Sequence, residues 1–292
     1  MAVPQPGIFA LGTLAHSYVE LDLAPGASAA DLVRGVAGLV EPRTTMGGVN
    51  LVTGFRPELW TGPAPEGLHG FTEPVVGPDG YTMPATQHDA ALWVAGGSYD
   101  LVFDAVIGML TSLEGVAVLA HEVVGWTYHR DLDLTGFIDG TENHSVLVSP
   151  HEALVPDGSP GAGGSVLLLQ QWAHDAGAWT SLPVEQQEAV IGRRKADSIE
   201  LEDKPEGSHV ARTDQDEFGQ IFRRNTPYGS VTDHGTMFVG FAAEQGPLAR
   251  MLDSMAGIGS VRDDLTRYTT ALTGSYYFVP SVDDLRASGS TR

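Results

Sequence analysis

The strongest constraint on the fold is a succession of strand-like and helix-like segments that occurs twice along the chain. In the first half, β-branched and aromatic residues predict strands, and apolar residues at helical spacing predict helices behind the N-cap residues Ser28 and Ser98. The predicted strands are 8–23, 49–55, 90–95 and 116–128, and the predicted helices are 29–40 and the segment after Ser98. A loop over 57–87, rich in proline and glycine, separates the second strand from the third.

The second half repeats this outline. Its predicted strands are 166–172, 236–242 and 275–279, and its predicted helices are 184–193, which follows Pro183, and 247–255. Glycines and a proline within 158–164 mark the interval 136–164 as a loop or a boundary. We therefore predict an α+β protein of two related domains, each an antiparallel sheet with helices on one face. The first domain covers 1–135 and the second 136–292, which includes the connecting segment 136–164.

The chain contains no cysteine. This excludes disulfide scaffolds, thiolate-bound zinc, iron–sulfur clusters, thiol catalysis and covalent attachment of a c-type haem. The ten histidines are then the only strong nitrogen ligands available to a transition metal.

The charge balance restricts the classes of molecule that the protein can bind. Sixteen Lys and Arg against 37 Asp and Glu give a formal net charge of −21, which disfavours binding to nucleic acid. No apolar run approaches the ~20 residues of a membrane span, and no basic N-terminal region leads into an apolar run. We therefore expect a cytoplasmic protein that binds neither nucleic acid nor membrane.

The densest polar cluster runs through Gly136-Phe137-Ile138-Asp139-Gly140-Thr141-Glu142-Asn143-His144. Asp139 follows two apolar residues and precedes a glycine, which predicts a carboxylate at the edge of a buried pocket. A local Asx-turn explains any Asp-Gly pair equally well. A calcium-binding loop is excluded, because its twelfth position would be Pro150 instead of glutamate.

Two further clusters carry candidate functional side chains. Arg223-Arg224-Asn225 places adjacent arginines in an acidic chain, where they are either surface charge or include one cation that stabilises an anion inside a cavity. Ser208-His209-Val210 contains a histidine that is either structural or a metal ligand.

Taken together, these clusters resemble the dye-decolourising peroxidases, in particular their compact bacterial B-type members. Residues 136–143 look like the family's distal Gly-x-x-Asp-Gly motif, residues 208–210 are similar to the segment of the proximal haem ligand, and residues 223–229 match the distal arginine segment. Segments 191–198 and 272–280 also look familial. The resemblance covers the C-terminal half through motifs and the N-terminal half through the order of its elements.

The resemblance implies two ferredoxin-like domains, with haem held mainly by the C-terminal one. It implies a peroxidase with one non-covalent haem b per chain, which uses hydrogen peroxide to form a ferryl intermediate and then oxidises dyes and other aromatic reductants in one-electron steps. The lack of cysteine agrees, because the iron must then take His, Met or Tyr as its axial ligand. Self-association is common in this group, so we also expect a homo-oligomer.

The resemblance also assigns roles to individual residues around the haem. His209 is the proximal iron ligand, and Asp263 is its carboxylate partner, with the adjacent Asp264 as the alternative. Asp139 relays a proton of the peroxide, and Arg223 stabilises the negative charge that develops on the departing oxygen. Asn225 shapes the hydrogen bonds on this distal side.

Two features stay open. Arg193 and Arg194 either include a partner of a haem propionate or form a basic helix C-terminus. His144 stands where the family usually has proline, and it either alters proton traffic near the distal loop or faces solvent.

Two other functions compete with the peroxidase. One is a haem-binding, transport or iron-release protein with incidental peroxidase activity. The other is a non-haem α+β enzyme or binding module in which His209 is structural.

Overall fold

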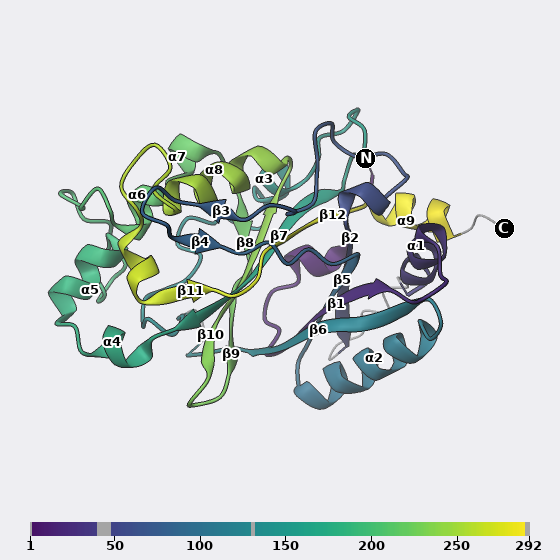
Figure 1. Cartoon of the computed structure of the whole chain (residues 1–292), viewed down its shortest axis with the longest axis horizontal. Coiled ribbons are helices and arrows are strands. Elements are labelled where there is room, and N and C mark those ends of the chain that lie inside the picture. Colours follow the sequence, from purple (N-terminus) through teal and green to yellow (C-terminus); the bar gives the residue numbers. More distant parts are fainter. Residues whose placement is uncertain (1, 40–47, 130–131, 290–292) are drawn as a thin grey trace.

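Strands from both halves of the chain join in one ten-stranded sheet, which is the centre of the computed structural model (Figure 1). The structure describes residues 2–39, 48–129 and 132–289. The first half contains η1 (Pro6–Phe9), β1 (Ala15–Leu23), α1 (Ala29–Ala37), β2 (Val49–Phe55), η2 (Pro57–Leu59), β3 (Val75–Val76), β4 (Thr82–Met83), β5 (Ala90–Gly96), α2 (Tyr99–Ser112) and β6 (Ala117–Trp126).

The second half contains more elements, several of them a single turn long. They are α3 (Pro150–Ala153), β7 (Ser165–His174), α4 (Ala176–Thr180), α5 (Val184–Ile191), α6 (His209–Arg212), α7 (Gln215–Phe218), β8 (Phe222–Arg223), β9 (Thr226–Gly229), β10 (His234–Ala242), α8 (Gln245–Met255), η3 (Asp264–Arg267), β11 (Thr269–Ala271), β12 (Ser275–Val279) and α9 (Val282–Gly289). None of the described helices is both long and apolar enough to cross a membrane.

The sheet closes on itself. Its order is β11-β7-β12-β2-β5-β1-β6-β9-β10-β8, and an additional antiparallel pairing of β7 with β10 joins the two ends into a barrel. The two halves meet at two seams, which pair Phe278 with Phe55 and Gly125 with Tyr228. The longer ladders, such as β1 with β5 and β7 with β10, lie within one half.

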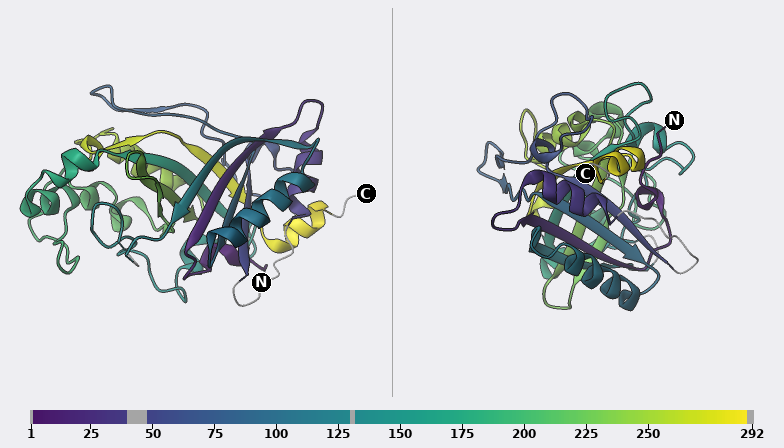
Figure 2. Two further views of the ribbon diagram at one scale, coloured as in Figure 1. Left: turned by 90° about the horizontal axis from the view of Figure 1, so that it is seen from below. Right: turned by 90° about the vertical axis from the view of Figure 1, so that its right-hand side faces the viewer.

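Successive side chains along each strand point alternately into the barrel interior and toward its outer face. Leu167 and Leu169 of β7 belong to the apolar cluster that fills the barrel with residues from both halves. Leu168 and Trp172 point to the opposite face, where α8 packs on the second half. Helices α1, α2 and α9 cover the outer face of the first half, on the other side of the molecule from α4 to α8 (Figures 1 and 2).

The α+β class and the antiparallel pairing are confirmed, and most long elements lie where the sequence predicts them. Ser28 caps α1 through a reciprocal capping box with Asp31. The strand predicted from residue 8 begins at Ala15, because Pro6–Phe9 forms a short 3-10 helix instead. The helix predicted over 184–193 ends at Ile191, because Gly192 adopts a φ of 92°. The helix predicted over 29–40 ends at Ala37, and residue 40 lies outside the described residues.

Candidate active site

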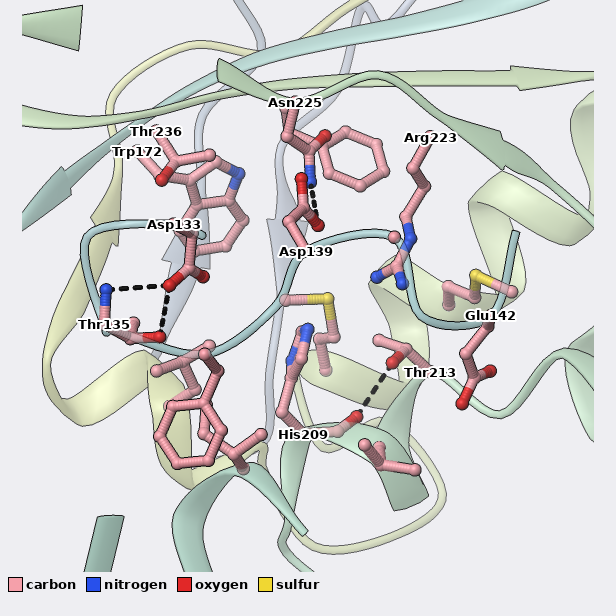
Figure 3. Close-up of a pocket in the computed structure, with 18 of the residues that line it drawn as sticks. Asp133, Thr135, Asp139, Glu142, Trp172, His209, Thr213, Arg223, Asn225 and Thr236 are labelled. Carbon is pink, nitrogen blue, oxygen red and sulfur yellow. Dashed lines mark hydrogen bonds between the residues drawn. The ribbon is translucent and has the colours of Figure 1, made fainter. Parts of the chain in front are cut away.

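A large cavity lies between the outer face of the second half of the sheet and the helices that cover it (Figure 3). Its empty volume is about 1220 Å³, part of which is open to solvent. The walls are largely apolar, and they come from β7, β10, α8 and the loop after β6. The apolar lining residues are Phe137, Ile138, Leu168, Trp172, Ile191, Val210, Ile221, Phe238, Leu248, Met251, Leu252, Met255 and Leu265.

The cavity brings together four of the side chains that the sequence singled out. Asp139, His209, Arg223 and Asn225 all line it. In Figure 3, His209 rises from one wall, while Asp139, Asn225 and Arg223 lie at the opposite wall. Asp263 does not line the cavity but lies behind His209.

His209 is the first residue of α6, and a fully buried carboxylate holds its ring. Its Nδ1 donates to Oδ2 of Asp263 at 2.7 Å, and the side chain of Asp263 has 0 % exposure. The other oxygen of Asp263 accepts from the backbone N–H of Leu265 at 2.8 Å. Because Nδ1 carries the donated proton, Nε2 keeps a free lone pair that can bind a metal. Asp264 instead pairs with Arg267, so Asp263 is the partner.

Asp139 is positioned by Asn225 across the cavity wall. The Asn225 amide donates to Oδ1 of Asp139 at 3.2 Å, and its own carbonyl oxygen accepts from the backbone N–H of Val239 at 3.0 Å. This second bond fixes which end of the amide faces the carboxylate. Gly140 follows with a φ of 71°, a conformation that glycine adopts without strain.

Arg223 ends β8 and is held through its backbone by a residue that the sequence analysis did not single out. The Asn143 side chain accepts from the N–H of Arg223 at 2.9 Å and donates to its C=O at 2.8 Å. The side-chain Nε of Arg223 is buried and has no hydrogen-bond partner among the described residues. Its guanidinium therefore keeps donor capacity at the cavity. In the sequence, Asn143 stood out only as a member of the Asp-Gly cluster and as the last residue of the segment 136–143 that resembles the family motif.

The neighbouring arginines differ in whether they line the main cavity: Arg193 and Arg223 do, and Arg224 does not. Arg224 donates to the carbonyl oxygens of Ile8 and Ala10, both at 2.8 Å, and lies 4.9 Å over the ring of Trp93. Burial lowers its pKa to about 10, and it ties the N-terminal segment to the barrel. Arg193 lines the main cavity and is bound by Glu142 and Glu200.

Arg194 and His144 lie away from the cavity. Arg194 makes an exposed ion pair with Asp197. His144 is 53 % exposed and bonds Glu152 at 2.5 Å, which corresponds to the solvent-facing alternative.

Two further titratable residues line the cavity and were missed. Burial lowers the pKa of His174 to about 4, and its Nε2 lies 3.1 Å from the hydroxyl of Thr236. Burial raises the pKa of Asp133 to about 6, and the nearby charge of Asp139 raises it as well. No sequence pattern distinguishes either residue from an ordinary polar residue on the surface, because their positions in the cavity depend on how distant segments pack.

Residues 130–284 match the family model described as "Dyp-type peroxidase, C-terminal". The chain is 36% identical over 305 residues to a dye-decolorizing peroxidase of Rhodococcus erythropolis, covering 97% of this chain and 88% of that protein.

Solved structures agree. A dye-decolorizing peroxidase from Bacteroides thetaiotaomicron is 30% identical with a TM-score of 0.88, and the match covers 99% of both chains. A DypB variant from Rhodococcus jostii RHA1, solved in complex with heme, is 30% identical with a TM-score of 0.87 and covers 98% of both chains.

Proposed function

Because the chain belongs to the dye-decolourising peroxidase family and is therefore a haem peroxidase, we propose that His209 binds the haem iron and that Asp139, Arg223 and Asn225 act on hydrogen peroxide from the other side. One observation carries this assignment. A histidine backed by a buried carboxylate stands across one apolar-walled cavity from a carboxylate, an amide and an arginine.

The donor set of the cavity suits haem. Among the described residues, no three or more His, Asp and Glu side chains gather closely enough to hold a bare metal ion. A single histidine with a free Nε2, apolar walls and a cation fit an iron whose remaining ligands come from a porphyrin. Of the two arginines at 193 and 194, only Arg193 lines the cavity, and it is our candidate partner for a haem propionate. Bound there, haem supplies the redox centre that reduces peroxide and oxidises organic reductants one electron at a time.

The hydrogen bond between Asp263 and His209 determines how strongly His209 donates electron density as a ligand. Asp263 accepts the Nδ1–H of His209, which fixes the tautomer and raises the basicity of Nε2. Bound to a haem iron, a more basic His209 would donate more electron density to it, which would favour cleavage of the O–O bond of peroxide.

The distal groups divide the work on peroxide. Asp139 takes the proton from one peroxide oxygen and returns it to the other, which then leaves as water. Arg223 places a permanent positive charge where negative charge develops on the departing oxygen. Asn225 orients the Asp139 carboxylate through the 3.2 Å hydrogen bond. These three groups favour a peroxidase over a haem carrier, because storage or transport of haem needs no proton relay opposite the histidine.

Absorption spectroscopy tests this function. Purified protein loaded with haem should show a Soret band. Rapid mixing with one equivalent of hydrogen peroxide should shift that band. A reductant such as a phenol or a dye should restore the original spectrum. Protein that binds haem but leaves its spectrum unchanged with peroxide would instead be a carrier.

We also propose that 1–135 and 136–292 are two ferredoxin-like domains. Each half follows the βαββαβ pattern along the chain. The elements are β1-α1-β2-β5-α2-β6 in the first half and β7-α5-β9-β10-α8-β12 in the second. The sheet orders β2-β5-β1-β6 and β9-β10-β7-β12 are equivalent when strands are matched by their position in each half. Limited proteolysis should cut first within 136–164, and a first cut inside a strand of the ten-stranded sheet would count against this boundary.

We propose a homo-oligomer on the basis of an apolar stripe on α2. Tyr99, Phe103 and Ile107 follow one another at four-residue spacing on one helix face, and each is about half exposed, at 48, 50 and 50%. Sedimentation of the wild-type protein and of Phe103→Asp tests whether this stripe buries itself against a second copy. The cytoplasmic location stays a prediction, which cell fractionation tests.

A further inference from the structure

A second carboxyl group lies close to Asp139 in the same segment. Asp133 precedes Asp139 by six residues, and a β-bridge between Leu132 and Ile138 folds the segment back on itself. Within this loop, the N–H of Asp133 donates to the C=O of Phe137 at 3.0 Å. Both carboxyl groups consequently line the same cavity, as Figure 3 shows.

Asp133 also reaches a second cavity. This outer cavity has an empty volume of about 930 Å³, which includes space open to solvent, and Trp126 and Tyr128 form part of its wall. It shares Asp133, Asp139, Arg223, Asn225 and Thr236 with the main cavity. Asp133 and Asp139 therefore both face the main cavity and this second route to solvent.

The hydrogen bonds of Asp133 leave one carboxyl oxygen open. Oδ1 accepts from the backbone N–H of Thr135 at 2.8 Å and from its hydroxyl, whereas Oδ2 has no hydrogen-bond partner among the described residues. A proton can therefore reside on Oδ2 without loss of the Thr135 bonds. The titratable and charged groups that line the two cavities with Asp133 are Tyr128, Asp139, Glu142, His174, Arg193, His209, Arg223 and Arg224.

The electrostatics of the site agree with this geometry. Burial is the main cause that raises the pKa of Asp133 to about 6, and the charge of Asp139 adds to it, while the Thr135 bonds and His209 act in the opposite direction. Below about pH 6 the Asp133 proton is therefore present, and above it a negative charge stands beside Asp139.

We propose that Asp133 acts through Asp139 as a proton-holding residue that connects the outer cavity to the peroxide site. Reduction of one peroxide to two waters consumes two electrons, which the organic reductant supplies, and two protons, which must enter the site. After Asp139 has returned the peroxide proton, Oδ2 of Asp133 gives one of these protons to the Asp139 carboxylate. This leaves Asp133 ionised and Asp139 neutral, and water of the outer cavity then reprotonates Asp133. No electrons move in this exchange. The inference rests on the proposed peroxidase function, because it assigns Asp133 to the proton traffic of that reaction.

The competing explanation is that Asp133 only caps its own turn. The bond from the N–H of Thr135 to Oδ1 is an Asx-turn, and such turns are common in loops. Asp133→Asn separates the two explanations, because the asparagine carbonyl still accepts from Thr135 but cannot titrate. Asp175→Asn is the matched control, since the exposed Asp175 likewise accepts a local N–H, that of Ala178 at 2.8 Å.

Infrared spectroscopy of the ferric haem protein, titrated from about pH 4 to about pH 8, measures the proton directly. Wild type and Asp175→Asn should show a protonated carboxyl band that is lost around pH 6, and Asp133→Asn should lack it. Asp139→Asn should shift the midpoint of that band to lower pH, because a neighbouring negative charge is removed. A band that persists in Asp133→Asn, or a midpoint that Asp139→Asn does not move, would overturn the proposal.

Stopped-flow rates with peroxide give the second measurement. The wild-type rate should depend on an ionisation near pH 6, and Asp133→Asn should lose that dependence while haem content stays unchanged. An unaltered pH profile would reduce Asp133 to a turn cap. Wild-type protein that fails to react with peroxide at every pH would refute the proposed function, and the infrared titration would still decide whether the two carboxyl groups are coupled.

Discussion

The two sides of the cavity differ in how firmly their functional groups are held. On the His209 side, a 2.7 Å bond links the ring to a carboxylate with no exposure, and a backbone N–H holds that carboxylate in turn. On the opposite side, the bond from Asn225 to Asp139 is 3.2 Å long, and the groups line two cavities with openings to solvent. The first side is suited to keep one geometry, and the second to admit small molecules and exchange protons.

The difference also appears in how each side is anchored. His209 begins α6 and Asp263 directly precedes η3, and the hydrogen bond between them joins two side chains. Asp139 and Arg223 are instead oriented through Asn225 and Asn143, which bond to backbone groups. Amide side chains that mimic backbone pairing hold a loop to a strand without filling the cavity. Substitutions on the two sides should therefore change different measured quantities.

The largest expected effect is on haem binding. His209→Ala removes the proposed axial ligand, so we expect the affinity for haem to fall by about 100-fold or more. Titration of the protein with haem, followed at the Soret band, measures this. His174→Ala is the control in the same cavity, because His174 bonds Thr236 and should leave the affinity within a few-fold of wild type. The reverse result would make His174 the ligand.

The next effect is on the reaction with peroxide. Arg223→Ala removes the distal cation and should slow that reaction by about 100- to 1000-fold with unchanged haem content. Stopped-flow spectroscopy gives the rate constant. Arg223→Lys keeps the charge without the planar fork and should recover part of the rate. A wild-type rate in Arg223→Ala would assign charge stabilisation to another group.

A smaller effect is expected from substitution of Asp263, the carboxylate that holds the proposed ligand His209. Asp263→Asn keeps an oxygen that can accept from Nδ1 but loses the negative charge, so haem affinity or activity should fall by about 10- to 100-fold. The reduction potential of the iron should also rise, because the histidine becomes a weaker donor; spectroelectrochemical titration measures it. Asp264→Asn is the matched control, since Asp264 pairs with Arg267. Equal potentials in wild type and Asp263→Asn would contradict the role of the carboxylate.

The smallest effect concerns the anchoring of Arg223. Asn143→Ala loses two hydrogen bonds to the backbone of Arg223, and we expect a loss of about 1–3 kcal/mol in the free energy of unfolding. The peroxide rate should fall less than in Arg223→Ala. Urea unfolding and stopped-flow rates measure the two effects. His144→Ala, one residue on, breaks only an exposed pair and should change stability by about 0–1 kcal/mol.

Length and periodicity explain which elements the sequence could predict. The strand 49–55 and the strand 275–279 lie where predicted, and α2 follows Ser98 as expected, because each repeats its apolar pattern over several residues. The four-residue helix α6 and the two-residue strand β8 carry His209 and Arg223, yet neither is long enough to show a period. The site therefore lies on elements whose shape depends on tertiary contacts.

The sequence by itself determined the α+β class and the exclusion of thiolate chemistry, and its motifs supplied the candidate site residues His209, Asp139, Arg223 and Asn225. The tertiary structure decided which residue of an adjacent pair takes part in the site. Asp263 rather than Asp264 meets His209, and Arg223 enters the main cavity while Arg224 turns into the barrel. Adjacent side chains of an extended segment point to opposite faces, so one of two arginines must point away, but only the packed sheet determines which face is the cavity.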